Sequence, residues 1–267
     1  MGTVQSKDGT TIAFEVRGSG RPVILVDGAT AYPAISPDTV ALAEALSADF
    51  RVYTYDRRGR GGSTDTLPYA VEREIDDLAA LVAEAGGPVV LFGWSSGSIL
   101  CMDAVAAGLP VTHLVAFEPP FVVDDGRPPL PGDYVERLEA ACAAGRPGDA
   151  VELFMTAAVG MPAEFVAGMR QSEYWPVLEA VAPTIAYDGR VVRDVMQGRP
   201  LPTDRWATIA VPTLVVHGNA TFPFLVTGAQ AAAEVLPGAS LQSVPGENHT
   251  AAADVLAPAI QQFVQAN

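Results

Sequence analysis

The chain has 267 residues, of which 49% are hydrophobic and 18% charged, and its net charge is −15. This length and composition predict a folded protein whose core needs neither a disulfide nor a structural metal. The excess of acidic side chains argues against nucleic acid and anionic membranes as partners, because both attract basic surfaces.

The sequence carries little sign of export or redox chemistry. Its two cysteines, Cys101 and Cys142, form neither a disulfide framework nor a metal-ligand pattern. The N-terminal residues do not show the basic segment followed by an apolar segment that is typical of a secretory signal. No apolar run reaches the roughly 18 residues that a membrane span requires. We therefore expect a cytoplasmic protein without metal or cofactor. Its expected partners are a small-molecule substrate and, as one option, a second copy in a homodimer.

Short β-branched runs alternate with helix-periodic segments over the first 120 residues. The predicted strands cover residues 11–16, 22–26, 51–55, 89–92 and 111–117. The predicted helices cover residues 40–46, 71–85 and 96–107. This alternation is typical of a mostly parallel sheet flanked by helices, which is the α/β class.

The pattern changes after Pro119 and Pro120, where strand signals stop. The helix-like stretches that follow cover residues 134–144, 150–158, 163–169 and 174–182. The alternation resumes with a strand at 211–216, a helix at 228–235, a strand at 241–244 and a helix at 252–264. We predict an α/β core formed by residues 1–120 and 207–267, interrupted by an all-helical cap at 121–206.

The sharpest chemical motif is Gly93-Trp94-Ser95-Ser96-Gly97, which fits G-x-S-x-G. It follows a predicted strand and opens a predicted helix, the setting in which this motif forms a tight turn that exposes its serine. The two glycines leave room for strand and helix to pass closely. The motif therefore predicts that Ser95 is a nucleophile.

A nucleophilic serine needs a base, and the chain has three histidines. His113 begins a strand, whereas functional groups of parallel sheets gather at the carboxyl ends of strands. His217 and His249 both follow strands. The chain order of nucleophile, acid and histidine in this type of fold selects His249, which lies just before the last helix.

Further motifs resemble the α/β-hydrolase superfamily. The segment Tyr55 to Ser63 resembles its D-x-R-G-x-G-x-S turn, and Pro245 to His249 resembles its histidine loop. The resemblance covers nearly everything except the helical insert, which in that family forms a cap over the active site.

The chain departs from the usual pattern of that superfamily at two places. Asp27-Gly28 stands where His-Gly is usual, and the loop Asn219 to Thr221 lacks the usual aspartate. Two positions therefore compete to hold the histidine: that neutral loop, and Glu118 at the end of the strand 111–117.

The zearalenone lactonases are similar in both departures, in the Ser-Ser-Gly elbow and in a Glu-Pro-type acid site. This resemblance implies a catalytic triad of Ser95, Glu118 and His249. It also implies an oxyanion hole made by the backbone N–H groups of Gly28 and Ser96.

Large apolar side chains are frequent in the predicted cap, which favours an apolar substrate. We take Phe121, Trp175 and Tyr187 as substrate-binding candidates. The expected reaction is hydrolysis of a carboxylic ester or lactone through an acyl-enzyme. The alternatives are a carbon–carbon bond hydrolase, or a non-hydrolytic use of the fold as a binding protein or a cofactor-independent lyase or cyclase.

Overall fold

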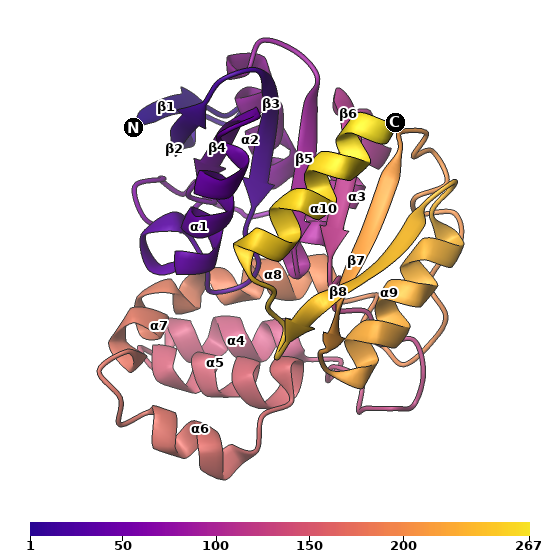
Figure 1. Ribbon diagram of the computed structural model, residues 1–267. Helices are drawn as coiled ribbons and strands as arrows, with labels where there is room; N and C mark the ends of the chain where they lie inside the picture. The colour runs from indigo at the N-terminus through magenta and orange to yellow at the C-terminus, as the bar shows by residue number, and fades with distance from the viewer.

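The computed structural model describes residues 1–267 and is built on one eight-stranded sheet (Figure 1). Its strands are β1 (Gly2–Gln5), β2 (Thr11–Gly18), β3 (Arg21–Val26), β4 (Phe50–Tyr55), β5 (Val89–Trp94), β6 (Val111–Phe117), β7 (Thr213–Ala220) and β8 (Ser240–Glu247). They lie in the order β1-β2-β4-β3-β5-β6-β7-β8. The pairs β1–β2 and β2–β4 are antiparallel, and all other neighbours are parallel.

Helices cover both faces of this sheet because both faces are apolar. Successive residues of β3 show the division: Val23 and Leu25 belong to one buried cluster, and Ile24 and Val26 to the other. Helices α1 (Pro37–Leu46) and α10 (Ala253–Ala266) cover the first face, in front of the sheet in Figure 1. Helices α2 (Val71–Glu84), α3 (Ser96–Ala106) and α9 (Pro223–Val235) cover the second.

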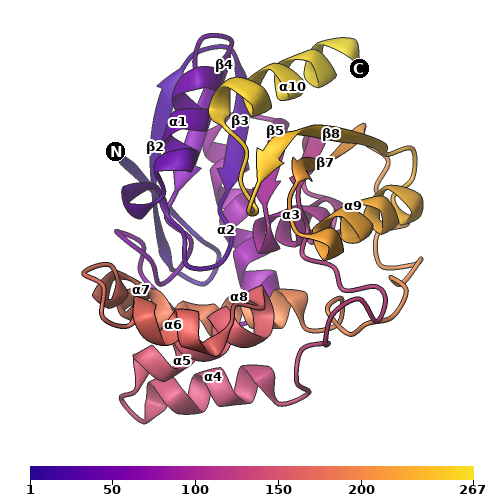
Figure 2. The ribbon, with the colours of Figure 1, turned by 60° about the horizontal axis from the view of Figure 1, so that its bottom comes forward.

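A group of helices between β6 and β7 lies beyond the carboxyl ends of the parallel strands (Figures 1 and 2). It consists of α4 (Tyr134–Ala143), α5 (Pro147–Leu153), a π-helical segment (Phe154–Val159), α6 (Ala163–Met169), α7 (Trp175–Val181), a 3-10 turn (Ala182–Thr184) and α8 (Ile185–Val192). Their apolar side chains join the same buried cluster as α2 and α3. The group occupies part of the predicted cap, whose status as a separate domain stays a prediction.

The predicted fold class is confirmed, and the predicted elements are found with shifts of a few residues at their ends. One strand, one α-helix and one 3-10 turn were not predicted: the four-residue β1, the eight-residue α8 and the turn Pro33–Ile35. The segment 150–158 is α5 followed by the π-helical turn rather than one helix. None of the helices combines the length and the apolar character that a membrane crossing requires.

Candidate active site

Ser95 occupies the sharp turn between β5 and α3. Its backbone has φ 56° and ψ −125°, a left-handed φ that residues with a side chain rarely adopt. A Cβ atom at Gly93 would lie 2.4 Å from Ser98 Cα, and one at Gly97 would lie 2.4 Å from the Val26 carbonyl oxygen. The turn is therefore possible only with glycine at both flanking positions, and it directs Ser95 into a cavity.

Glu118 follows β6 and is fully buried. Its Oε1 accepts a hydrogen bond from the Gly218 N–H at 2.8 Å, and its Oε2 accepts one from the Thr221 hydroxyl at 3.1 Å. The same Oε2 lies 2.5 Å from Nδ1 of His249, in the loop after β8. Because an ionised carboxylate only accepts hydrogen bonds, this contact places the imidazole proton on Nδ1 and leaves Nε2 as an acceptor.

The neutral loop that competed with Glu118 for the histidine serves a different purpose. Thr221 accepts a hydrogen bond from the backbone N–H of His249 at 3.2 Å, and Asn219 accepts one from the backbone N–H of Gly246 at 3.5 Å. Neither side chain forms a hydrogen bond with the imidazole ring. Of the two positions left open by the sequence, only Glu118 forms a hydrogen bond with the ring of His249.

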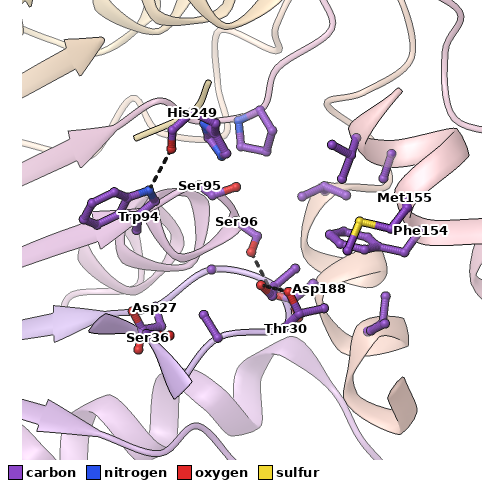
Figure 3. Close-up of a pocket in the computed structure, with 18 of the residues that line it drawn as sticks. Asp27, Thr30, Ser36, Trp94, Ser95, Ser96, Phe154, Met155, Asp188 and His249 are labelled. Carbon is purple, nitrogen blue, oxygen red and sulfur yellow. Dashed lines mark hydrogen bonds between the residues drawn. The ribbon is translucent and has the colours of Figure 1, made fainter. Parts of the chain in front are cut away.

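Ser95 and His249 line one cavity of about 400 Å³. Figure 3 shows Ser95 between the His249 loop and the cap residues Phe154 and Met155. The serine hydroxyl and the imidazole do not share a hydrogen bond in this structure. Such contacts are often long before a substrate binds and shorten in the complex.

Two backbone N–H groups border the serine. A Cβ atom built on Gly28 would lie 2.9 Å from Ser95 Cβ and 3.6 Å from Ser95 Oγ, so the chain at Gly28 passes directly beside the hydroxyl. Ser96 is the first residue of α3, where a backbone N–H has no partner within the helix. Donors in these places suit an oxygen that becomes negative beside Ser95.

The chain is also similar to known proteins over most of its length. A family model described as "Alpha/beta hydrolase family" matches residues 16–260. The chain belongs to the alpha/beta hydrolase family. A solved structure of an alpha/beta hydrolase from Sphaerobacter thermophilus DSM 20745 is 50% identical with a TM-score of 0.90, over 98% of this chain and 100% of that one.

More distant relatives of this alpha/beta hydrolase carry names of several activities. A non-heme haloperoxidase from Rhodococcus erythropolis is 27% identical over 99% of this chain and all of its own length. The enol-lactonase from Burkholderia xenovorans LB400 is 18% identical over 99% of this chain and 100% of that one, with a TM-score of 0.71, and shares the fold. The comparisons support an enzyme of the alpha/beta hydrolase class.

Asp27, which takes the place of the usual histidine of the family, is 5% exposed and borders the cavity of this alpha/beta hydrolase. Burial raises the pKa of Asp27 to about 6, although a hydrogen bond from Thr39 and the positive charges of Arg60 and Arg57 act in the opposite direction. The Thr39 hydroxyl donates to its Oδ1. Asp27 therefore changes its charge within a pH range in which the enzyme is easily assayed.

Three residues expected to bind substrate do not line the cavity. Phe121 packs against the Trp206 ring, and Trp175 donates its indole N–H to Glu179. Tyr187 stacks on Tyr69 with ring centroids 3.8 Å apart. Their bulk fills the interior of the cap and its contact with the core, so the structure does not support their assignment to the substrate site.

The residues that line the cavity from the cap side instead include Tyr134, Phe154, Met155, Val159, Asp188 and Met196. Asp188 is 3% exposed and accepts a hydrogen bond from the Ser96 hydroxyl at 2.7 Å. Sequence reasoning missed Asp188 because its helix was not recognised. No group of three or more His, Cys, Asp or Glu side chains is placed to bind a metal ion.

Proposed function

We propose that this protein is a serine hydrolase that cleaves a carboxylic ester or lactone of a moderately apolar small molecule. The observation that carries the proposal is that Ser95 and His249 line one cavity, while the buried Glu118 holds His249 from behind. Ser95 sits on a strained turn, and the imidazole is held through Nδ1 by a buried carboxylate, so its Nε2 is left to take a proton.

In the proposed reaction, Ser95 Oγ attacks the acyl carbon and its proton passes to His249 Nε2. The oxyanion is held by the N–H groups of Gly28 and Ser96, and Glu118 offsets the charge of the imidazolium. When the acyl–oxygen bond breaks, His249 returns the proton to the leaving alkoxide. Water then attacks the acyl-enzyme, gives a proton to His249 and releases the acid with Ser95 restored.

The cavity supports the proposed substrate class. Its volume of about 400 Å³ suits a molecule of moderate size, and more than half of its lining residues are hydrophobic. No lysine or arginine lines it, so an anionic substrate would find no counter-charge. The proposed substrates include lactones as well as open-chain esters, because several motifs are similar to those of the zearalenone lactonases.

The test is a panel of p-nitrophenyl esters with increasing acyl length together with aromatic and aliphatic lactones. We expect turnover that Ser95→Ala lowers about a thousandfold or more in kcat while the thermal unfolding temperature changes little. A fluorophosphonate probe should label Ser95, which peptide mapping identifies. Labelling of Ser96 or Ser98 instead would overturn the assignment of the nucleophile.

A second activity has its own assay because a relative that spans the whole chain is named a haloperoxidase. Halogenation of a phenolic acceptor in the presence of peroxide and bromide would reveal it. If halogenation occurs and no ester or lactone in the panel is cleaved, hydrolysis is the wrong proposal.

A further inference from the structure

Four buried charges form a cluster beside the cavity, and one of them, Asp188, lines the cavity. Arg57 binds Glu74 through Nε and Nη2, both at 2.7 Å, and binds Asp188 Oδ1 through Nη1 at 2.6 Å. Arg60 binds Asp188 Oδ2. All four residues are no more than 3% exposed, and their formal charges cancel. Buried ion pairs of this kind are costly to break from one side, so the geometry of the cluster is tightly held.

The two arginines also hold the loop that carries Gly28. Arg57 Nη1 donates to the carbonyl oxygen of Asp27 at 3.1 Å, and Arg60 Nη1 donates to the carbonyl oxygen of Gly28 at 2.7 Å. The Asp27 carbonyl and the Gly28 N–H belong to one peptide group, and in a trans peptide they point in opposite directions. By fixing the carbonyl, Arg57 therefore fixes the direction of the Gly28 N–H.

Asp188 links this loop to the other side of the proposed oxyanion hole. Its Oδ1 accepts hydrogen bonds from Arg57 Nη1 at 2.6 Å and from the Ser96 hydroxyl at 2.7 Å. Oδ1 of Asp188 is thus connected to the Asp27–Gly28 peptide through Arg57 and is hydrogen-bonded directly to Ser96. Figure 3 shows Asp188 close to Ser96 on the cavity side.

We propose that Asp188 is a positioning residue that aligns both N–H donors of the oxyanion hole, the Gly28 donor through Arg57 and the Ser96 donor through the serine hydroxyl. The inference rests on the proposed function. Since Asp188 belongs to α8 in the helical insert and the two arginines belong to the core, the insert completes the oxyanion hole in addition to enclosing the substrate.

The decisive variant is Asp188→Asn, which keeps the shape of the side chain but removes its charge and turns an amide N–H₂ toward one of its donors. With p-nitrophenyl butyrate we expect kcat to fall about ten- to hundredfold, because loss of a whole oxyanion donor costs about a hundred- to a thousandfold. KM should stay within about twofold, since the ground-state carbonyl relies little on these donors.

A merely structural role would not reproduce the second readout. The boron atom of phenylboronic acid bonds to Ser95 Oγ, and the proton of the serine hydroxyl passes to His249. One boron-bound oxygen then lies in the oxyanion hole. The inhibition constant of phenylboronic acid should rise by about the same factor as kcat falls. Ser96→Ala, which removes a single hydrogen bond and no buried charge, should show the same paired changes at about three- to tenfold.

The control is Asp103→Asn. Asp103 on α3 also joins the core to the end of the insert, through Arg205 at 2.7 Å and the Trp206 indole N–H at 2.8 Å, but its carboxylate forms no hydrogen bond with the Gly28 loop. This variant should keep kcat and the boronate affinity within about twofold of wild type.

The outcomes separate the inference from the proposed function. If the wild-type enzyme cleaves esters and both Asp188→Asn and Ser96→Ala keep kcat and boronate affinity within about twofold, the positioning role is wrong while the hydrolase stands. If Asp188→Asn does not fold, Ser96→Ala decides on the same two readouts. If the wild-type enzyme cleaves no ester or lactone, the proposed function fails and the inference fails with it.

Discussion

Exchanging Glu118 for glutamine tests how the imidazole is held. In the structure both carboxylate oxygens face donors: Oε1 faces the Gly218 N–H, and Oε2 faces Nδ1 of His249 and the Thr221 hydroxyl. A glutamine must turn its N–H₂ group toward one of these sides. The hydroxyl can rotate and the imidazole can move its proton, whereas the backbone N–H of Gly218 can do neither. The amide nitrogen therefore settles at the histidine side.

That arrangement produces the wrong tautomer. Nδ1 of His249 becomes an acceptor, the proton moves to Nε2, and the face toward Ser95 can no longer take the serine proton. The equivalent exchange in a serine protease lowers kcat about ten-thousandfold. We expect Glu118→Gln to lower kcat about a hundredfold or more, which corresponds to at least about 2.7 kcal/mol of transition-state stabilisation.

KM should change little because Glu118 does not line the cavity. The assay is initial-rate hydrolysis of p-nitrophenyl butyrate, with thermal unfolding measured alongside to verify folding. Asn219→Ala is the matched control. The asparagine side chain accepts one long hydrogen bond and forms none with the ring, so we expect a loss below about tenfold. Near-full activity of Glu118→Gln together with inactivity of Asn219→Ala would refute the assignment.

Two further substitutions probe the loop beside the nucleophile. Gly28→Ala would place a Cβ atom 2.9 Å from Ser95 Cβ and 3.0 Å from the Trp94 carbonyl oxygen, so we expect kcat/KM to fall at least about tenfold, and an unchanged value would show that the loop lies elsewhere. Asp27→Asn should stabilise the protein at pH 8, because burial raises the pKa of Asp27 from 3.8 to about 6 and ionisation therefore opposes folding above that pH by roughly 3 kcal/mol. The gain in stability should disappear near pH 4, where Asp27 is mostly protonated in the folded protein and increasingly protonated in the unfolded chain. The measurement is urea unfolding of both proteins, and equal stability at pH 8 would contradict the prediction.

The turn that carries Ser95 could be predicted from the sequence because the residues that determine it are close together in the chain. Gly93 and Gly97 are needed within five residues of chain, and the strand before and the helix after them have clear periodicity. Glu118 could also be recognised as a candidate. The carboxyl ends of neighbouring parallel strands lie at one edge of the sheet, and β6 neighbours both β5 and β7.

The role of Asp188 could not be predicted from the sequence, because it depends on residues that are far apart in the chain. Its helix is eight residues long and contains Gly189, which weakens its helical signal, and its arginine partners lie about 130 residues earlier in the chain. The direction of the Tyr187 side chain could not be predicted for a related reason. Its size and apolar ring indicated burial but not direction, and the side chain stacks on Tyr69 while its neighbour Asp188 lines the cavity.

The division of the buried charges between core and insert restricts how new substrate pockets can be made from this scaffold. A chimera that replaces residues 121–206 with the insert of a relative would keep Arg57 and Arg60, which belong to the core. Unless the transplanted segment carries an acidic residue that reaches both guanidinium groups, Arg60 has no carboxylate partner. An uncompensated buried charge costs about 3–5 kcal/mol, a large share of the stability of a typical domain. Successful transplants should therefore be those whose donor insert supplies that acid.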